Sequence, residues 1–220
     1  DQTLDALRTA GITPVGAGRN RVEAWAPVTI DMPSGSRVLV LAAGTTSSGI
    51  PWDWAAGKRR PGVALLPDLS ENTVDRIAAI VRSVARPHDV VVLSVHWGGN
   101  WGYNIGQDRR WFAHQVIDRS GVHVVHGHSS HHPLGIEVYR GQLILYGCGD
   151  LLTDYEGIQT HEQYRGDLGA LYLPTIDDET GALRRLELVP TKVERFQLTR
   201  PPADDVRWLA TALHREGASL

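Results

Sequence analysis

The stretch DVVVLSVHWGGNWG, residues 89–102, decides the fold class. Its first seven residues form a near-continuous apolar run, which is typical of a strand covered on both faces of a sheet. The glycine-rich segment that follows indicates a loop at the carboxyl end of that strand. Ligands bind beyond this end in open α/β sheets, so His96, the first residue after the apolar run, is a candidate site residue.

The segments on either side of this stretch alternate between strand and helix. RVLVLAAG (37–44) predicts a buried strand, and residues 70–85 predict an amphipathic helix that Ser70 can cap. A second helix is expected over 107–121, and VHVV (122–125) predicts the next strand. This βαβαβ order predicts an α/β fold with a parallel central sheet.

Other segments are expected to add a hairpin that turns at Arg140-Gly141, further strands and two terminal helices. No internal repeat or linker is visible, so we expect one domain over residues 1–220. These further elements are the helix 2–11, the short strand and glycine turn 12–18, the hairpin 135–147, the strands 168–174, 183–190 and 193–199, and the helix 202–217, with Val206, Leu209, Ala210 and Leu213 on its inner face.

The composition excludes several classes of protein. With 42% hydrophobic and 21% charged residues among 220, the chain can bury a core. A formal charge of −3 gives no general attraction to nucleic acid, and no apolar run approaches the ~20 residues of a membrane segment. The single cysteine, Cys148, excludes an internal disulfide and favours the cytoplasm. A helix that starts at the first residue suggests missing upstream sequence, which leaves export or membrane anchoring open.

Five of the ten histidines lie in HVVHGHSSHH, residues 123–132. His128 follows the predicted strand VHVV, and His131 lies on the same turn. Together with His96 they could bring three neutral imidazoles to one edge of the sheet, which is a plausible transition-metal site. For a lone histidine at a strand end, a surface or hydrogen-bonded role is the usual alternative. His132 is either a pocket wall or a support for a ligand residue, and His123 and His126 are expected to be structural. The other histidines are expected to be ordinary surface or packing residues: His88, His114, His161 and His214.

Carboxylates are also candidates for this edge of the sheet. Asp150 follows the strand QLILYGCG and could reach the same cleft, although a turn cap is about as good a reading. Glu137 alternates within a strand and is expected to be structural or supporting. The other candidates are Asp53 and Asp154, and Asp154 could simply start a turn together with Glu156.

Aromatic and basic side chains crowd two loops. IPWDWAAGKRR (50–60) brings two tryptophans next to three basic residues, and HWGGNWGYN (96–104) adds two tryptophans and a tyrosine. Such loops are costly to expose unless they bind something, which suggests a peptide-like or anionic polymeric ligand. The alternative is that the tryptophans hold long loops against the core. The residues concerned are Trp52, Trp54, Lys58, Arg59, Arg60, Trp97, Trp101 and Tyr103.

The segment DVVVLSVHWGGNWG, followed by VVHGHSSHHPLGIEVYRGQLILYGCGDLL, resembles the CapA-like family of poly-γ-glutamate capsule-synthesis proteins. The resemblance runs from about Thr3 to the final helix. It implies a branch of the calcineurin-like metallophosphoesterases, a four-layer α/β sandwich that binds two metal ions. It further implies that His96, His128 and His131 occupy late metal-ligand positions of that superfamily.

The chain departs from this family in two ways. The early motifs, which supply an Asp, further acidic residues and an Asn-His pair, would precede Asp1, so we expect the N-terminal part of the fold to be missing. The usual Gly-His-His-Pro-His turn reads GHSSH here, and the usual Gly-Asn-Phe is replaced by Gly149-Asp150-Leu151. These departures leave open whether a metal binds.

Three functions are compatible with these patterns. The first is a metal-dependent hydrolase of a phosphoryl or peptide/polyglutamate substrate, with two divalent metal ions. The second is a metal-independent His/Asp acid–base enzyme, such as a peptide epimerase. The third is a non-catalytic module that binds an acidic polymer through Lys58, Arg59 and Arg60. The candidate catalytic residues are His96, His128, His131 and Asp150, and the candidate substrate-binding residues are Trp52, Trp54, Arg59, Arg60, Trp97, Trp101 and His132.

Overall fold

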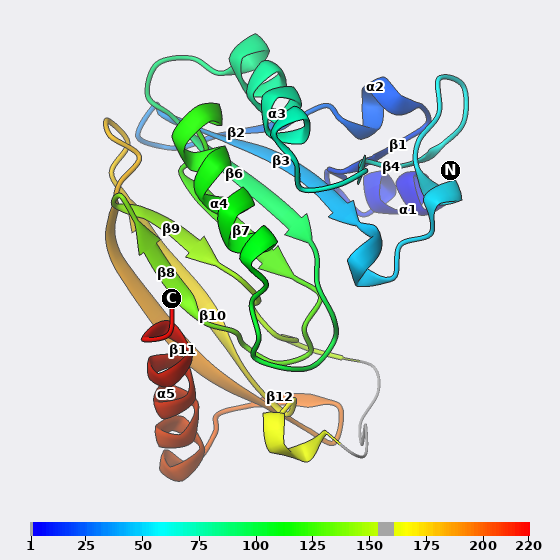
Figure 1. Cartoon of the computed structure of the whole chain (residues 1–220). Coiled ribbons are helices and arrows are strands. Elements are labelled where there is room, and N and C mark those ends of the chain that lie inside the picture. The colour runs from blue at the N-terminus through cyan, green and yellow to red at the C-terminus, as the bar shows by residue number, and fades with distance from the viewer. Residues whose placement is uncertain (1, 154–160) are drawn as a thin grey trace.

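A seven-stranded sheet stands at the centre of the computed structural model, which describes residues 2–153 and 161–220 (Figure 1). Its strands lie in the order β2-β3-β6-β7-β9-β8, with β5 paired to β3 beside this row. The inner strands β3, β6, β7 and β9 are parallel, whereas β2 and β8 pair antiparallel at the edges. The predictions of an α/β fold and a parallel central sheet are confirmed. The bounds are β2 (Val28–Asp31), β3 (Arg37–Thr45), β5 (Leu65–Leu66), β6 (Asp89–His96), β7 (Val124–His128), β8 (Ile136–Tyr139) and β9 (Gln142–Leu145).

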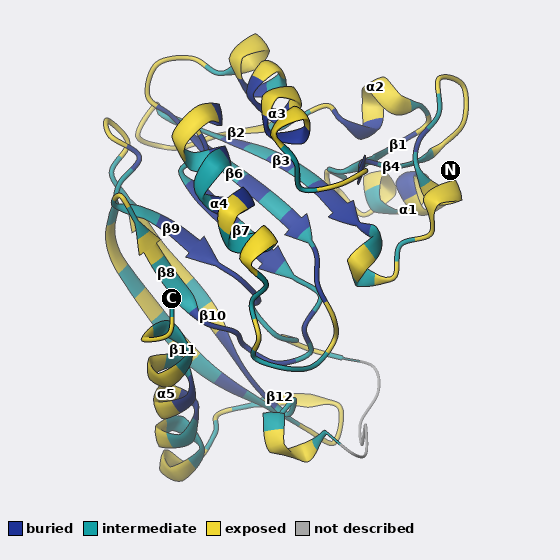
Figure 2. Ribbon diagram, in the orientation of Figure 1, coloured by how far each residue is buried: buried dark blue, intermediate teal, exposed yellow. Residues whose placement is uncertain are grey.

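Two helices, α3 (Glu71–Val84) and α4 (Gln107–Ser120), cover one face of this sheet (Figure 1). Figure 2 shows buried stripes on both helices and exposed residues on their outward sides. Alternate strand residues such as Leu93 and Val125 are fully buried in one cluster with Ile77, Phe112 and Val116 of the helices. The apolar face that alternation gives to the strands therefore packs against the apolar face that a 3.6-residue period gives to the helices, in one core.

The start and end of α3 differ in detail from the sequence prediction. Ser70 occupies the N-cap position, but its side chain makes no capping hydrogen bond. Instead its hydroxyl donates to Asp68 Oδ1, which also accepts from the Thr73 hydroxyl. The helix ends at Val84, one residue before the predicted end, and Val84 is 40% exposed.

A second, three-stranded antiparallel sheet lies against the opposite face of the central sheet, in the order β10-β11-β12. Leu143 and Leu145 of β9 pack there with Tyr172 and Ile176 of β10. The predicted strand 193–199 is interrupted by a turn, because Arg195 and Phe196 have φ values of 54° and 58°. The bounds are β10 (Leu168–Ile176), β11 (Leu183–Glu194) and β12 (Gln197–Thr199).

The β8–β9 hairpin turns where the sequence predicted, with φ values of 50° at Arg140 and 83° at Gly141. The strand expected at 122–125 begins two residues later and extends to His128. This shift places His126, Gly127 and His128 inside β7. The site residues of this strand therefore belong to the sheet and not to the loop after it.

The remaining described elements surround these two sheets (Figure 1). The inner face of α5 is formed by Leu209 and Ala212, whereas Ala210, expected there, is exposed. A short strand and a glycine turn were predicted over 12–18, and the strand found there, β1, consists of Ala17 and Gly18. These elements are α1 (Gln2–Thr9), β1 (Ala17–Gly18), α2 (Arg21–Ala24), η1 (Thr46–Ser48), η2 (Trp52–Trp54), β4 (Gly62–Val63), η3 (Glu162–Tyr164) and α5 (Ala203–Gly217), which contacts β8.

A helical layer, the central sheet and the three-stranded sheet thus follow one another. The single domain and the four-layer sandwich that the resemblance implies remain predictions. Within the described ranges, every helix is too short or too polar to cross a bilayer.

Candidate functional site

His96 and His128 are the last residues of β6 and β7, and they are direct partners in the parallel register of these strands. Their Nδ1 atoms lie 3.0 Å apart, and their ring centroids lie 5.0 Å apart. The Trp97 N–H donates to the His128 carbonyl oxygen at 2.9 Å, which ties the strand ends together. The sheet therefore holds these two imidazoles as a hydrogen-bonded pair.

Both rings of this pair are held in the neutral form. Burial lowers the pKa of His128 from 6.5 to about 4, and the neighbouring His126 and His96 add to this effect. Burial, followed by the charge of His131, also lowers the pKa of His96. In a pair of neutral imidazoles, one Nδ1 carries the hydrogen and the other accepts it.

Ser94 extends this pair along the face of β6 that is turned away from the helices. Its Oγ lies 3.1 Å from His128 Nε2 and 3.0 Å from His126 Nδ1. Burial lowers the pKa of His126 as well. A continuous hydrogen-bonded row therefore runs from His126 through Ser94 and His128 to His96.

The end of β3 contributes hydroxyl groups behind His96. The Ser48 hydroxyl donates to the His96 carbonyl oxygen at 3.0 Å, and the Thr45 hydroxyl donates to the same oxygen at 3.3 Å. The Gly98 N–H donates to the Ser47 hydroxyl at 3.0 Å. These bonds fix the backbone at the point where the chain leaves β6.

His131 and Asp150 form a second pair on the loops that follow β7 and β9. His131 Nδ1 lies 2.7 Å from Asp150 Oδ2, and both side chains are 24% exposed. The His131 N–H donates to the carbonyl oxygen of Asn100 at 2.9 Å. The loops after β6, β7 and β9 are thereby joined at one edge of the sheet.

Trp101 packs in the middle of an aromatic group at this edge. Its ring centroid lies 5.3 Å from that of His131, 5.9 Å from that of His132 and 4.6 Å from that of His161. Tyr164 closes the group at 5.9 Å from Trp101. The packing limits the orientations available to the His131 ring.

Other predicted residues take supporting positions. Trp97 is only 1% exposed and donates from Nε1 to the Tyr146 carbonyl oxygen, so it is a core residue and cannot face a substrate in this structure. His132 is fully buried, and its Nε2 accepts the Gly102 N–H at 3.2 Å. Glu137 accepts from the Tyr146 hydroxyl at 2.8 Å and lies 2.8 Å from His114.

The tryptophans and basic residues predicted at 50–60 lie on the surface. Trp52 and Trp54 are 60% and 59% exposed on η2. The guanidinium of Arg60 donates to the Ala55 carbonyl oxygen of its own loop at 2.9 Å. Exposed side chains complete this surface: Asp53, Lys58 and Arg59. The candidate Asp154, together with Glu156, lies outside the described residues.

Sequence reasoning missed Ser94, the hydroxyls after β3 and His161. Ser94 could have been found from the period of two, since it shares a face with His96 and His126 shares one with His128. The sequence TTSS, residues 45–48, lies at the carboxyl end of its strand, where the rule that indicated His96 also applies. His161 carries no local signal, because its stacking on Trp101 joins distant parts of the chain.

The resemblance implies metal ions held by His96, His128 and His131, and the donor atoms allow a test of that expectation. Across residues 2–153 and 161–220, no three His, Cys, Asp or Glu side chains form a group that could hold a metal ion. The Nδ1 atoms of His96 and His128 face each other, and that of His131 faces Asp150. The described side chains do not by themselves form a metal site, and metal binding remains a prediction.

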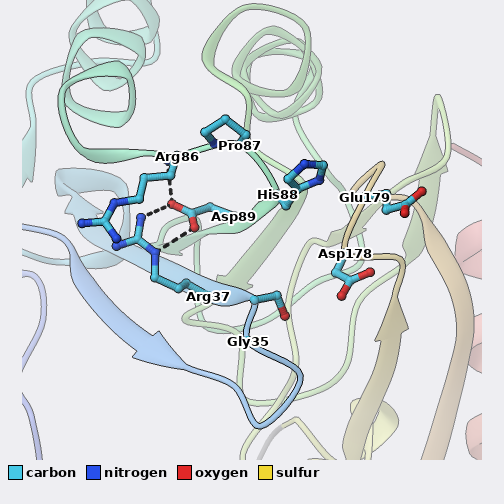
Figure 3. A pocket seen from close by; sticks show the side chains of 9 residues that line it. Gly35, Arg37, Arg86, Pro87, His88, Asp89, Asp178 and Glu179 are labelled. Atoms are coloured by element: carbon cyan, nitrogen blue, oxygen red, sulfur yellow. Dashed lines mark hydrogen bonds and ion pairs between the residues drawn. The ribbon is translucent and has the colours of Figure 1, made fainter.

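A pocket of about 450 Å³ lies at the other edge of the sheet, where β3 and β6 begin (Figure 3). Arg37 binds both carboxylate oxygens of Asp89, and the Arg86 N–H donates to the same carboxylate at 2.8 Å. Asp178 and Glu179 lie across the pocket from His88. None of the predicted catalytic residues lines this pocket, so we assign it no part in the chemistry.

Comparison with known proteins identifies relatives for most of the chain. A family model described as bacterial capsule synthesis protein PGA_cap matches residues 1–155. A probable polyglutamine synthesis accessory protein of Mycobacterium tuberculosis is 44% identical over 214 residues, covering 97% of this chain and 56% of the relative. The PGA biosynthesis protein CapA of Bacillus subtilis is 30% identical over 161 residues, covering 73% of this chain and 40% of the relative. The chain thus spans about half the length of these curated relatives, or less.

Proposed function

The chain belongs to the family of bacterial capsule synthesis proteins, and from this membership we propose that it acts in the synthesis of a polyglutamate-like polymer. The relatives are named for polyglutamine synthesis and for PGA biosynthesis. Their substrates are expected to contain amide bonds and repeated side chains. We further propose an acid–base activity toward an amide of such a peptide polymer.

The contact between His131 Nδ1 and Asp150 Oδ2, at 2.7 Å, is the observation that carries this proposal. A carboxylate that accepts the Nδ1 hydrogen selects the tautomer in which Nε2 has a lone pair. It also stabilises the imidazolium that forms when Nε2 takes a proton. His131 is therefore a general base that Asp150 orients.

We propose that His131 Nε2 removes a proton from a water molecule while the water oxygen attacks an amide carbonyl. His131 then returns the proton to the nitrogen of the breaking C–N bond. General acid–base catalysis of this kind contributes typically about 10²–10⁴-fold in rate. The reaction class is hydrolysis, as the resemblance also implies.

The histidine row has a complementary role in this proposal. If the Ser94 hydroxyl donates to His128 Nε2 and His128 Nδ1–H donates to His96 Nδ1, then His96 carries its hydrogen on Nε2. Such a fixed N–H can stabilise the oxygen charge that develops when water attacks a carbonyl. The neutral state of the row supports a donor role over that of a proton acceptor.

The test uses the full-length protein and a γ-linked glutamyl oligomer in deuterated water, analysed by mass spectrometry. We expect cleavage products that His131→Gln and Asp150→Asn reduce by at least about 100-fold. His214→Gln, on the exposed face of α5, is the matched control and should leave the rate unchanged. Retention of full activity by both site variants would refute the proposal.

The same experiment distinguishes the alternative reactions. Deuterium at an α-carbon without cleavage would indicate an epimerase, for which two separate imidazole groups at one edge are the favouring observation. Activity lost in chelator and restored by a divalent cation would indicate the metal-dependent hydrolase.

A non-catalytic binding role is the second candidate, and the exposed surface of Trp52, Trp54, Lys58 and Arg59 favours it. Aromatic rings beside unburied cations suit an anionic peptide chain. If the protein binds polyglutamate without changing its length or its α-hydrogens, this function replaces the enzymatic one.

A further inference from the structure

A cavity of about 770 Å³ lies between the central sheet and β10 of the three-stranded sheet. Its walls are the facing surfaces of the two sheets, on the side of the central sheet opposite α3 and α4. Val92, Val124 and Leu145 line it from the central sheet, and Ala170 and Ile176 line it from β10. This volume is within the range of pockets that bind small organic ligands, roughly 300–1,000 Å³.

The walls of this inter-sheet cavity carry no cationic side chain among the described residues that line it. Asp178 contributes a carboxylate to the lining, and most of the other lining side chains are apolar. A carboxylate entering this partly open cavity would lose part of its hydration without gaining an opposite charge. An uncharged apolar group would instead contact apolar side chains.

The wall also contains polar groups that remain protonated. Burial raises the pKa of the Cys148 thiol to about 12 and raises that of the Tyr172 hydroxyl. Among the described residues, the buried Tyr172 hydroxyl has no hydrogen-bond partner. An unsatisfied buried hydroxyl is uncommon in folded proteins, and it suits a ligand with a hydrogen-bond acceptor.

The cavity adjoins the candidate site at the carboxyl ends of β7 and β9. His128 lines the cavity and also bonds to His96, and Gly149 lines it next to Asp150. A group seated in the cavity would therefore hold whatever is attached to it beside the histidine pairs.

We propose that the inter-sheet cavity binds an uncharged, predominantly apolar group of a ligand and excludes carboxylates. The acidic side chains of a glutamyl polymer would stay outside it. This inference depends on the cavity walls and not on the acid–base role of His131, so it stands or fails separately from the proposed function.

The test measures binding of the uncharged fluorescent probe N-phenyl-1-naphthylamine to the full-length protein. We expect saturable binding that Val92→Trp weakens by at least about tenfold, because the indole fills the cavity. The matched control Val138→Trp places the same ring on an exposed position of β8 and should leave binding unchanged. Circular dichroism verifies that each variant is folded.

Charge selectivity is tested by competition between 1-decanol and decanoate, which share one chain length. We expect the alcohol to displace the probe at a concentration at least about tenfold lower. Met32→Lys adds a cation at an exposed lining position and should reduce this preference, whereas Met32→Leu should not. These two variants change an exposed residue, so the selectivity test does not depend on the stability of Val92→Trp.

Several results would overturn the inference. They are absence of saturable probe binding, equal effects of Val92→Trp and Val138→Trp, and equal competition by the alcohol and the acid. Probe binding to residues 1–220 but not to the full-length protein would assign the cavity to another segment of the longer chain. Dissociation of a dimer by Val92→Trp, seen by light scattering, would assign it to a second copy.

Discussion

His96 Nδ1 and His128 Nδ1 lie 3.0 Å apart at the ends of two neighbouring parallel strands. Protonation of either imidazole would place a positive charge in a partly buried environment, which is unfavourable. The pair therefore couples the stability of the sheet to pH.

We expect the protein to lose stability as the pH falls from neutral toward 4. The pKa of His128 is about 4 in the folded state and 6.5 when exposed, so the unfolded state binds more protons in this window. Stability is complete above the unfolded value and falls through the window, by up to about 3 kcal/mol. Melting temperatures measured between pH 7.5 and 4 test this, and His128→Asn should flatten the decline. An equally steep decline in this variant would contradict the assignment.

The ion pair at the start of β3 and β6 predicts a different effect of pH. The Arg37 guanidinium lowers the pKa of Asp89, so this carboxylate stabilises the fold fully above its unfolded pKa of 3.8. The stabilisation is lost as the pH falls from 3.8 through the lower pKa of the folded state. At neutral pH, Asp89→Asn should lower the melting temperature by several degrees, because Arg37 loses a partner in a largely buried place. Asp75→Asn, in an exposed pair with Arg119, is the control and should have little effect.

A glycine is required at position 127 because Trp97 and the Tyr146 backbone pack closely against it. A Cβ there would lie 2.5 Å from both Trp97 Nε1 and the Tyr146 carbonyl oxygen. Gly127→Ala should therefore cost about 1–3 kcal/mol in the free energy of unfolding, measured with denaturant. Gly99→Ala has no atom closer than 4.0 Å and should be nearly neutral. A neutral Gly127→Ala would show that β7 can shift.

Ser94 is expected to act as a positioning residue for the histidine row. Ser94→Ala removes the hydroxyl between His126 and His128, and we expect kcat to fall about tenfold while KM changes little. Ser94→Thr keeps a hydroxyl and should restore most of the rate. Equal losses in both variants would indicate a packing effect, and a change confined to KM would contradict a role in the reaction.

The basic surface predicts a salt-dependent interaction. Replacing Lys58, Arg59 and Arg60 together with Ala should weaken binding of polyglutamate at low salt and remove most of its dependence on ionic strength. Because Arg60 also bonds to its own loop, the double variant of Lys58 and Arg59 is the cleaner comparison. Binding that all three substitutions leave unchanged would exclude this surface as the polymer site.

Much of the fold could be predicted because it follows from local pattern. The apolar run before His96 indicated a buried strand, and the periodicity of residues 70–85 indicated an amphipathic helix. The alternation of strands and helices along the chain indicated a parallel sheet. The strand β7 was placed too early, because HGHSSH looks like a loop by composition. Its pairing with β6 and β9 extends it through His128, and this pairing is a property of the sheet and not of the segment.

Of the candidate site, the sequence indicated individual residues but not the contacts that surround them. Position at a strand end indicated His96, and the turn after β7 indicated His131, with Asp150 as a possible partner. The surroundings could not be read from the sequence. The burial of Trp97 between Phe112 and Tyr146 depends on how α4 and the hairpin pack, and the stacking of Trp101 on His161 joins segments sixty residues apart.

The in-register pairing of β6 with β7 also limits how this chain can vary in length. A single-residue insertion within Val124–His128 would turn the imidazole of His128 from the cavity side toward the helices, because successive strand residues face opposite ways. An insertion of two residues would return the His128 side chain to the cavity side of the sheet, but it would no longer pair with His96. Relatives that keep this chemistry should therefore differ in length in the connections between strands and not within these five positions.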